Sequence, residues 1–400
     1  MRGRSVLIAV LVTAVVAVTA RRAHADAPVA PLGPPITSRD YAIELYDNST
    51  LGNDATIAMG GAAVANAIGS SGTLVNPSAP AVRPTTDTDH WSWDDHLGYL
   101  DSSLSRDYDN NGRIDPGGSG TAVLTGGLAL RVGDWAVAAT ATVQSLQIAD
   151  AMPLTADTMR AKVAVARWVP AWDLALGGAV QLAQFDLKPD CSGCASLFSI
   201  NGAGLEAGAT WIPRARSFRL GGEAATPITG ANVVASTCAD PAACEGYILP
   251  LNVVSAWRVA AGGAYRFAPT AWNQQVRTPW RDERALTAVA DLVVVGSTAN
   301  AYGLEGFGQH ERQRSGVHAS YSLRGGVEYE WRPGRLRLRG GSYWEPGRYA
   351  EVSGRLHGTF GLELRALEFD LWGPRRGQLT LTGDVAARYR NVGLAVGFWH

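Results

Sequence analysis

The amino-acid sequence predicts an all-β protein, a 14-stranded antiparallel transmembrane β-barrel. Three observations point to this fold class: apolar residues alternate along the chain after about residue 86, tryptophans recur beside tight turns, and the last strand is apolar. Along that strand, positions 392–398 alternate Val, Leu, Val and Phe with small residues, and Trp399 follows. A soluble sheet normally has a polar outer face, whereas the lipid face of a barrel must be apolar.

The composition narrows the class of protein further. Charged residues make up 18% of the chain, hydrophobic residues 46%, and 46 of the 400 residues are glycine. The chain is therefore too apolar for a disordered protein and too rich in glycine for a helical one. A formal net charge of −1 gives no basic surface for nucleic acid. A large β-barrel of this length can form one domain.

Residues 1–25 have the features of a secretory signal peptide. Arg2 and Arg4 precede an apolar run over residues 6–20, and residues 23–25 form the small-x-small cleavage site Ala-His-Ala. The alternative, an anchor helix, needs about 20 apolar residues. No later stretch reaches that length, so we expect an exported chain whose membrane spans are strands.

The four cysteines form two close pairs, Cys191 with Cys194 and Cys238 with Cys244. Both pairs lie in turn-rich segments, and neither has the His or Cys spacing of a zinc site. We expect two disulfides that clamp loops in an oxidising compartment. Three connectivities are open, with pairing inside each close pair as the default. The alternative of a redox Cys-x-x-Cys needs a βαβ context that the pattern lacks.

The alternation of apolar and polar residues predicts fourteen strands. Their expected ranges are 87–98, 120–132, 134–148, 158–169, 172–187, 200–212, 216–229, 247–267, 283–298, 316–331, 334–345, 354–371, 376–386 and 388–399. Short connections place Trp next to Pro or Gly, as in Trp331-Arg-Pro-Gly-Arg335, and long ones hold both cysteine pairs. Trp at one rim is typical of an interfacial girdle with tight periplasmic turns. A soluble sandwich would explain the alternation but neither the Trp rim nor the apolar last strand.

A stretch near the N-terminus carries a family resemblance. Small residues predict a helix over about 53–67, and within it residues 58–65 read Ala-Met-Gly-Gly-Ala-Ala-Val-Ala. Together with Asn76-Pro77, this stretch resembles the plug signature of the FadL/TodX outer-membrane transport family, although Ser78 stands before the expected Ala79. Residues 246–250 and 338–348 resemble later segments of the same family.

The resemblance implies the domain organisation and the function. Residues 26–85 would form a leader and a luminal plug, and residues 86–400 the barrel. The plug residues would be Met59, Gly60, Gly61, Asn76 and Pro77. Such a protein admits long-chain fatty acids or other hydrophobic small molecules through the outer membrane of a Gram-negative bacterium. It would work as a monomer in outer-membrane lipid.

Two other function classes remain as alternatives. One is a non-transporting barrel that acts as a shuttle or scaffold for surface secretion. The other is an enzyme, which would need a nucleophile and base at the membrane rim. No histidine of the expected mature chain lies in a Gly-x-Ser-x-Gly-like context, so we predict no catalytic residues.

The first long connection contains a motif that resembles a calcium loop. Asp107, Asp109, Asn111, Arg113 (through its carbonyl) and Asp115 occupy positions 1, 3, 5, 7 and 9 of that pattern. Position 12 is Gly instead of a bidentate Glu, so the expected Ca²⁺ affinity is weak, on the order of 10⁻⁴–10⁻³ M. The alternative is an acidic surface turn without metal. Acidic and His residues over 87–96 are expected to be a solvated strand edge or lumen wall.

Charged residues also fall on the lumen-facing side of the predicted strands. They are Glu206, Arg219, Glu223, Arg258, Arg266, Asp291, Arg324, Glu328, Arg337, Arg339, Glu363, Arg365 and Asp384. Because both signs are present, we expect an ion-pair network. Alternatively, an arginine holds a ligand carboxylate, with Arg258 and Arg324 as the candidates.

Overall fold

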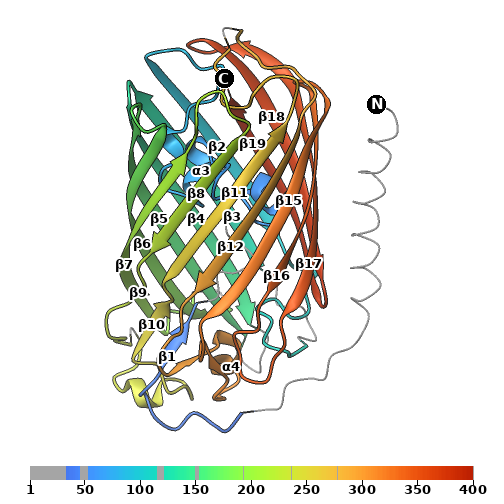
Figure 1. Cartoon of the computed structure of the whole chain (residues 1–400). Helices are drawn as coiled ribbons and strands as arrows, with labels where there is room; N and C mark the ends of the chain where they lie inside the picture. The colour runs from blue at the N-terminus through green and yellow to red at the C-terminus, as the bar shows by residue number, and fades with distance from the viewer. Residues whose placement is uncertain are drawn as a thin grey trace.

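The structure is a computed structural model of a closed barrel (Figure 1). It describes residues 33–45, 53–114, 121–148, 153–191, 193–235, 237–276 and 278–399. The expected signal peptide and Asp115 of the expected calcium loop lie outside these residues. Within the described ranges, fourteen antiparallel strands each pair with two neighbours, so the sheet closes on itself.

The barrel strands follow one another around the ring in chain order. They are β2 (Trp91–Asp101), β3 (Thr121–Val132), β4 (Trp135–Ile148), β5 (Leu154–Val169), β6 (Leu174–Pro189), β7 (Phe198–Trp211), β8 (Phe218–Ala225), β11 (Arg258–Phe267), β12 (Leu286–Val295), β15 (Ser320–Arg332), β16 (Leu336–Glu345), β17 (Arg355–Asp370), β18 (Pro374–Ala386) and β19 (Tyr389–Trp399). The predicted count of fourteen is confirmed.

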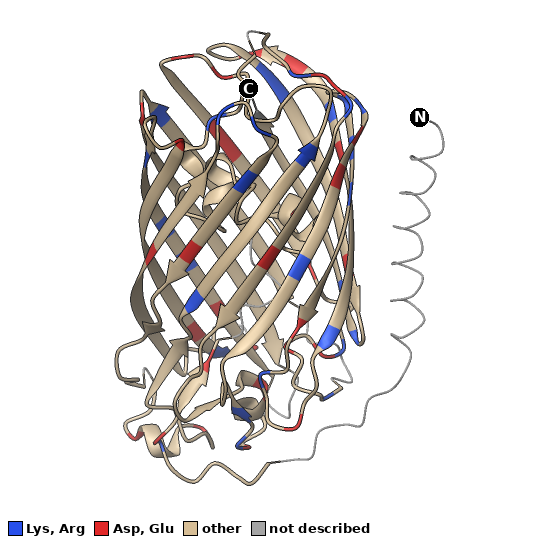
Figure 2. Cartoon of the chain, in the orientation of Figure 1, with Lys and Arg blue, Asp and Glu red and all other residues tan. Residues whose placement is uncertain are grey.

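The two faces of the wall differ as the alternation predicts. On the last strand, Leu394 lies opposite Tyr99 of β2 and Leu381 of β18, and all three side chains point outward, each more than two-fifths exposed. The alternate positions are buried inside the barrel, for example Asn391. Figure 2 shows that charges of both signs nevertheless occur along the strands. The outer face is therefore an apolar band of the kind that hydrocarbon requires.

The tryptophans of the short turns lie at one end of this band. Trp172, Trp211, Trp331 and Trp372 are exposed on the outer surface there, at the end where β19 also terminates. This arrangement confirms the predicted aromatic rim. We call this end of the barrel the turn end, and the opposite end, which carries the long connections, the loop end.

A second sheet of five short strands, which we call the mouth sheet, lies at the loop end (Figure 1). In sheet order, its members are β14 (Arg314–Ser315), β13 (Ala301–Tyr302), β1 (Ala42–Glu44), β10 (Asn252–Ser255) and β9 (Ile228–Thr229). The N-terminal strand β1 pairs in parallel with both β10 and β13. Ile43, Phe198, Tyr247 and Phe307 belong to the large apolar core at this end, so the mouth of the barrel is filled by packed side chains.

Both disulfides lie in the long connections and join the cysteines of each close pair. Cys191 is bonded to Cys194, and Cys238 to Cys244. The default pairing is therefore confirmed.

Two predicted strands differ from the structure because the chain leaves the wall. The expected strand 216–229 ends in the wall at Ala225, where Pro227 follows and cannot donate a ladder hydrogen bond. Ile228 then packs against Gly202 and Gly204, on the inner face of β7. The expected strand 247–267 is divided between β10 of the mouth sheet and β11 of the wall.

The helices are short. They are α2 (Asp54–Ala58), α3 (Gly69–Thr73), α4 (Leu304–Gly308) and the 3-10 turns η2 (Ala79–Ala81) and η3 (Pro241–Ala243). Among the described residues, no helix has the length and apolarity needed to cross a membrane. The expected helix over 53–67 stops at Ala58, because Gly60 and Gly61 adopt positive φ angles of 69° and 70° and turn the chain.

One connection at the turn end is long, in contrast to the predicted tight turns. Residues 268–285 join β11 to β12 and fold back over the end of the barrel. The amide of Val276 donates to Thr85 O, and the amide of Asn273 donates to Arg216 O. This connection therefore forms one wall of a cavity described below.

The outward band leads to a first prediction. Changing Leu394 to Arg should destabilise the protein in lipid vesicles by about 2–4 kcal/mol, because an arginine near the middle of the hydrocarbon layer loses its hydration. Leu104 lies in a loop and is also exposed, so Leu104→Arg is the matched control and should change stability little. Equilibrium unfolding by denaturant measures both. Equal, small effects would mean that the band faces water.

Candidate functional site: the lumen

The segment from residue 53 to residue 82, which we call the luminal segment, lies inside the ring of strands (Figure 1). Its helix α2 contacts β2 and β16 to β19, α3 contacts β2 to β4, and η2 contacts β3 to β6. Met59, Gly60, Gly61, Asn76 and Pro77, the residues implied by the family resemblance, all belong to it. Most of its side chains are buried, so the segment fills the middle of the barrel.

Glycines allow the backbone of the luminal segment to touch the backbone of the wall. A Cβ atom on Gly60 would lie 2.6 Å from Gly325 O. Conversely, a Cβ on Gly326 would lie 2.4 Å from Met59 O, and one on Gly341 would lie 2.4 Å from the amide nitrogen of Gly60. These separations are shorter than van der Waals contact, so a larger residue on either side would force the two elements apart.

Asn76 joins the luminal segment to itself and to the wall. Its side-chain amide donates to Val64 O at 2.9 Å, and its Oδ1 accepts the amide of Ser78 at 3.0 Å. A Cβ on Gly208 of β7 would lie 2.1 Å from Asn76 Oδ1, and a Cβ on Gly177 of β6 would lie 2.1 Å from Pro77 O. Asn76 and Pro77 therefore pack directly against glycines of the wall.

Charged wall residues bind the backbone of the same segment. Asp291 Oδ2 accepts both amides of residues 63–64, at 2.6 and 2.9 Å. Lys162 Nζ donates to both carbonyls of residues 73–74 at 3.2 Å and also pairs with Glu206 at 2.6 Å. Buried peptide groups must be hydrogen-bonded, and these charges satisfy four of them. Alternation predicts that Asp291 faces the lumen but does not predict which peptide groups it binds.

Asp54, at the start of α2, is an exception among these buried charges. Its side chain is fully buried, and neither carboxyl oxygen has a hydrogen-bond partner in the part of the chain that the structure describes. A Cβ on Gly98 or Gly393 would lie within 2.5 Å of that carboxyl group, so two wall glycines make the space that it occupies. Burial raises the pKa of the Asp54 carboxyl from 3.8 to about 7.

Two cavities flank the luminal segment. The loop-end cavity, of about 130 Å³, lies toward the mouth sheet. Its lining includes Leu45, Leu74, Thr142, Ile228, Arg258 and Val295. The turn-end cavity, of about 230 Å³, lies between the luminal segment and the connection 268–285. Its lining includes Met59, Ala63, Arg219, Arg266, Trp272 and Arg337.

The inward charges form the predicted ion-pair network. Arg339 pairs with both Glu328 (2.7 Å) and Glu363, which lie on its two neighbouring strands. Arg258 pairs with Glu223 at 2.8 Å while also lining the loop-end cavity. Arg324 Nη1 lies 3.5 Å from Gly61 O of the luminal segment. A role for Arg258 or Arg324 in holding a ligand carboxylate stays a prediction.

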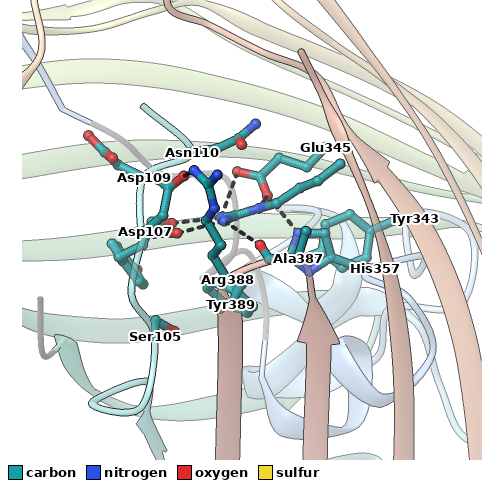
Figure 3. A network of polar contacts seen from close by, with 12 residues as sticks. Ser105, Asp107, Asp109, Asn110, Tyr343, Glu345, His357, Ala387, Arg388 and Tyr389 are labelled. Atoms are coloured by element: carbon teal, nitrogen blue, oxygen red, sulfur yellow. Dashed lines mark hydrogen bonds and ion pairs between the residues drawn. The ribbon is translucent and has the colours of Figure 1, made fainter. Parts of the chain in front are cut away.

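A polar network near the loop end holds the first long connection against the wall (Figure 3). Arg355 Nη1 and Nη2 donate to the carbonyls of residues 107–108 at 2.6 and 2.8 Å. Arg355 also pairs with Glu345, whose carboxylate contacts His357 at 2.6 Å. The other ring nitrogen of His357 contacts Asp384 at 2.8 Å. The network therefore ties this loop to β16, β17 and β18.

In the predicted calcium loop, side-chain oxygens accept hydrogen bonds from backbone amides of the same loop. Asp107 Oδ1 and Asp109 Oδ1 both accept the amide of Asn111, at 3.0 and 3.1 Å, and Asn111 Oδ1 accepts the amide of Arg113. In the described residues, no group of three or more His, Cys, Asp or Glu side chains is arranged to hold a metal ion. Asp115 lies outside them, and calcium binding stays a prediction.

Comparison with known proteins relates this fold to that of solved channels. No protein-family model matches the sequence, and no curated protein matches it either. Among solved structures, the toluene transporter TbuX of Ralstonia pickettii is similar at 14% identity and a TM-score of 0.52, over 88% of this chain and 98% of that one. The monoaromatic hydrocarbon channel CymD is similar at 12% identity and a TM-score of 0.51, over 88% of this chain and 97% of that one. The toluene transporter TodX of Pseudomonas putida is similar at 12% identity and a TM-score of 0.50, over 90% of this chain and 99% of that one. The chain therefore has the fold of FadL/TodX-type outer-membrane channels.

The wall glycines lead to a second prediction. Gly177→Ala should loosen the luminal segment by about 1–3 kcal/mol, because the new methyl group overlaps Pro77 O. The neighbouring Gly178 faces outward, and a Cβ there would lie 3.8 Å from the nearest carbonyl, Glu206 O. Gly178→Ala is therefore the matched control. Hydrogen exchange of peptides from residues 53–82 should accelerate in the first variant alone. Equal exchange in both variants would show that this contact does not hold the segment.

Asp54 leads to a third prediction, on pH. Since its pKa is higher in the folded protein than in the unfolded chain, its ionisation adds no cost below about pH 4 and destabilises the fold as pH rises toward 7. Asp54→Asn should therefore stabilise the protein little at pH 4 and by up to about 4 kcal/mol at pH 8. Denaturant unfolding of both proteins at the two pH values measures this difference. A stability difference that is the same at pH 4 and pH 8 would contradict the prediction.

Proposed function

We propose that this protein is an outer-membrane channel of the FadL/TodX type that takes up hydrophobic small molecules. The candidate substrates are monoaromatic compounds or fatty acids. The proposal rests on the fold shared with the toluene transporters TbuX and TodX and with the monoaromatic hydrocarbon channel CymD. Because the barrel closes on itself, a single chain in outer-membrane lipid would suffice as the working unit.

The observation that carries the proposal is the packed luminal segment. A barrel of this size without internal filling would enclose an aqueous channel open to any small solute. Here the backbone of the segment touches the wall at several glycines, and the cavities lie on either side of it. Such a lumen suits a selective path for apolar molecules and a poor path for ions.

A sideways route is favoured by the interruption between β7 and β8. Their ladder ends at the pair of Glu206 and Ala225. The first part of β7, from Phe198 to Leu205, therefore lies beyond this ladder. Ala225 and Ile228, at the place where the chain turns inward, line the loop-end cavity. We infer that a hydrophobic molecule enters this cavity and leaves through the wall at this interruption, without crossing the luminal segment.

The test is uptake of radiolabelled toluene by a host strain that lacks its own aromatic channels. Thr142→Trp should lower the uptake rate at least several-fold, because Thr142 lines the loop-end cavity and a tryptophan would fill much of its volume. Val143→Trp is the matched control, because Val143 is the next residue of β4 and points outward. It should leave uptake unchanged.

Two outcomes would contradict the proposal. One is uptake by cells expressing the protein that does not exceed uptake by cells carrying an empty vector. The other is equal uptake by the two tryptophan variants at equal amounts of folded protein, as judged by heat-modifiable gel mobility.

A further inference from the structure

One wall of the loop-end cavity carries uncharged hydrogen-bonding groups. The side chains of this kind are Thr140, Thr142, Thr158 and Gln181, on the neighbouring strands β4, β5 and β6. In the part of the chain that the structure describes, none of the four makes a side-chain hydrogen bond, and none of their polar atoms is sealed away from the cavity. Their hydroxyl and amide groups are therefore available to a bound molecule.

Thr142 and Thr158 are placed to bind one ligand group together. Thr142 is the ladder partner of Arg160, and Thr158 lies two residues before Arg160 on β5. Diagonal neighbours of this kind lie about 7–8 Å apart on one face of a sheet. A ligand hydroxyl between the two threonines can donate to one of them and accept from the other.

The rest of the cavity suits a single aromatic ring. Its apolar lining includes Leu45, Leu74, Ile228 and Val295. The cavity volume is about 130 Å³, and an apolar cavity of about 150 Å³ in a protein interior holds one benzene molecule. The volume therefore favours a one-ring compound over a long acyl chain.

The charged groups that line the cavity are already bound by other protein groups. Glu44 pairs with Arg348, Glu206 with Lys162 and Arg258 with Glu223, and Arg160 donates to Ser255 Oγ at 3.2 Å. An anionic ligand would compete with these carboxylates for their partners, and a carboxylate that loses its partner is costly in a buried site. A neutral ligand leaves the pairs intact.

We propose that the loop-end cavity binds a neutral hydroxylated aromatic compound of the phenol class. The phenolic hydroxyl would bond to Thr142 and Thr158, and the ring would lie against Leu74 and Ile228. A hydrocarbon of the same size displaces water from the two threonines without replacing its hydrogen bonds, whereas phenol replaces them. The site rests on the proposed function and deepens it, because it names a substrate class for the channel.

The test is equilibrium dialysis of radiolabelled phenol and toluene, in sealed cells, against the full mature chain in lipid nanodiscs. Empty nanodiscs correct for partition into lipid. Phenol and toluene are similar in size and differ in a hydroxyl against a methyl group. Thr158→Val keeps the side-chain shape and removes one hydroxyl, so it should weaken phenol binding about three- to tenfold without weakening toluene binding. Thr142→Val should act in the same direction and serves as the second variant if the first fails to fold.

Thr287→Val is the matched control. Thr287 is 6% exposed, against 7% for Thr158, but it lines the turn-end cavity. Phenol binding should therefore be unchanged in this variant. Benzoate serves as the anionic probe and should bind more weakly than phenol.

Phenol affinity that is unchanged in both folded threonine variants would overturn the proposal, as would an equal loss of phenol and toluene affinity. Benzoate binding as tight as that of phenol would overturn the neutral class, and a loss of phenol binding in Thr287→Val alone would move the site to the other cavity. Toluene uptake by cells without any phenol binding by the wild-type protein would overturn the site and leave the channel. Phenol binding without uptake of either compound would support the site and overturn the channel.

Discussion

The close contact between the luminal segment and the inner face of the wall is the constraint on which the rest of this structure depends. Peptide groups of residues 59–60 and 77–78 touch wall strands at positions where the wall has glycine, so no side chain separates the two backbones. Interiors are packed too tightly to absorb even one extra methyl group there without a shift. This contact separates the loop-end cavity from the turn-end cavity and fills the middle of a barrel that would otherwise be wide enough for a water-filled pore.

The same alternation that builds the wall also supplies the groups that hold the segment. Along each strand, one set of side chains meets the hydrocarbon and the other meets the lumen. The inward positions that hold the segment include glycines, such as Gly177 and Gly208, and polar groups, such as Asp291 and Lys162. Glycine permits the approach, Asp291 binds two amides of the irregular stretch between α2 and α3, and Lys162 binds two carbonyls at the end of α3.

Period-two patterning was sufficient to predict the strand number, the outward stripe of the last strand and the aromatic rim, because these depend on local sequence and on the solvent that each face meets. The division of 247–267 between two sheets was not predictable, because β10 pairs with the distant β1. The contacts of Asp291 and the surplus charge at Arg219 also depend on which remote segments meet in the lumen. The expected helix over 53–67 failed for a local reason that was visible, the Gly60-Gly61 pair.

The distribution of buried charge argues for two kinds of polar group in this lumen. A buried ion pair gains little net stability, but an unpaired buried charge is strongly destabilising. Arg337, Arg339 and Arg365 share Glu328, Glu330 and Glu363 so that each cation faces an anion, which makes that cluster a self-contained part of the wall. Trp272 and Asn273 fix the position of Arg219, but no carboxylate among the described residues forms an ion pair with it. Local violations of this kind are tolerated where they serve a function, and a small change at Arg219 would therefore alter the cavity without dismantling the barrel around it.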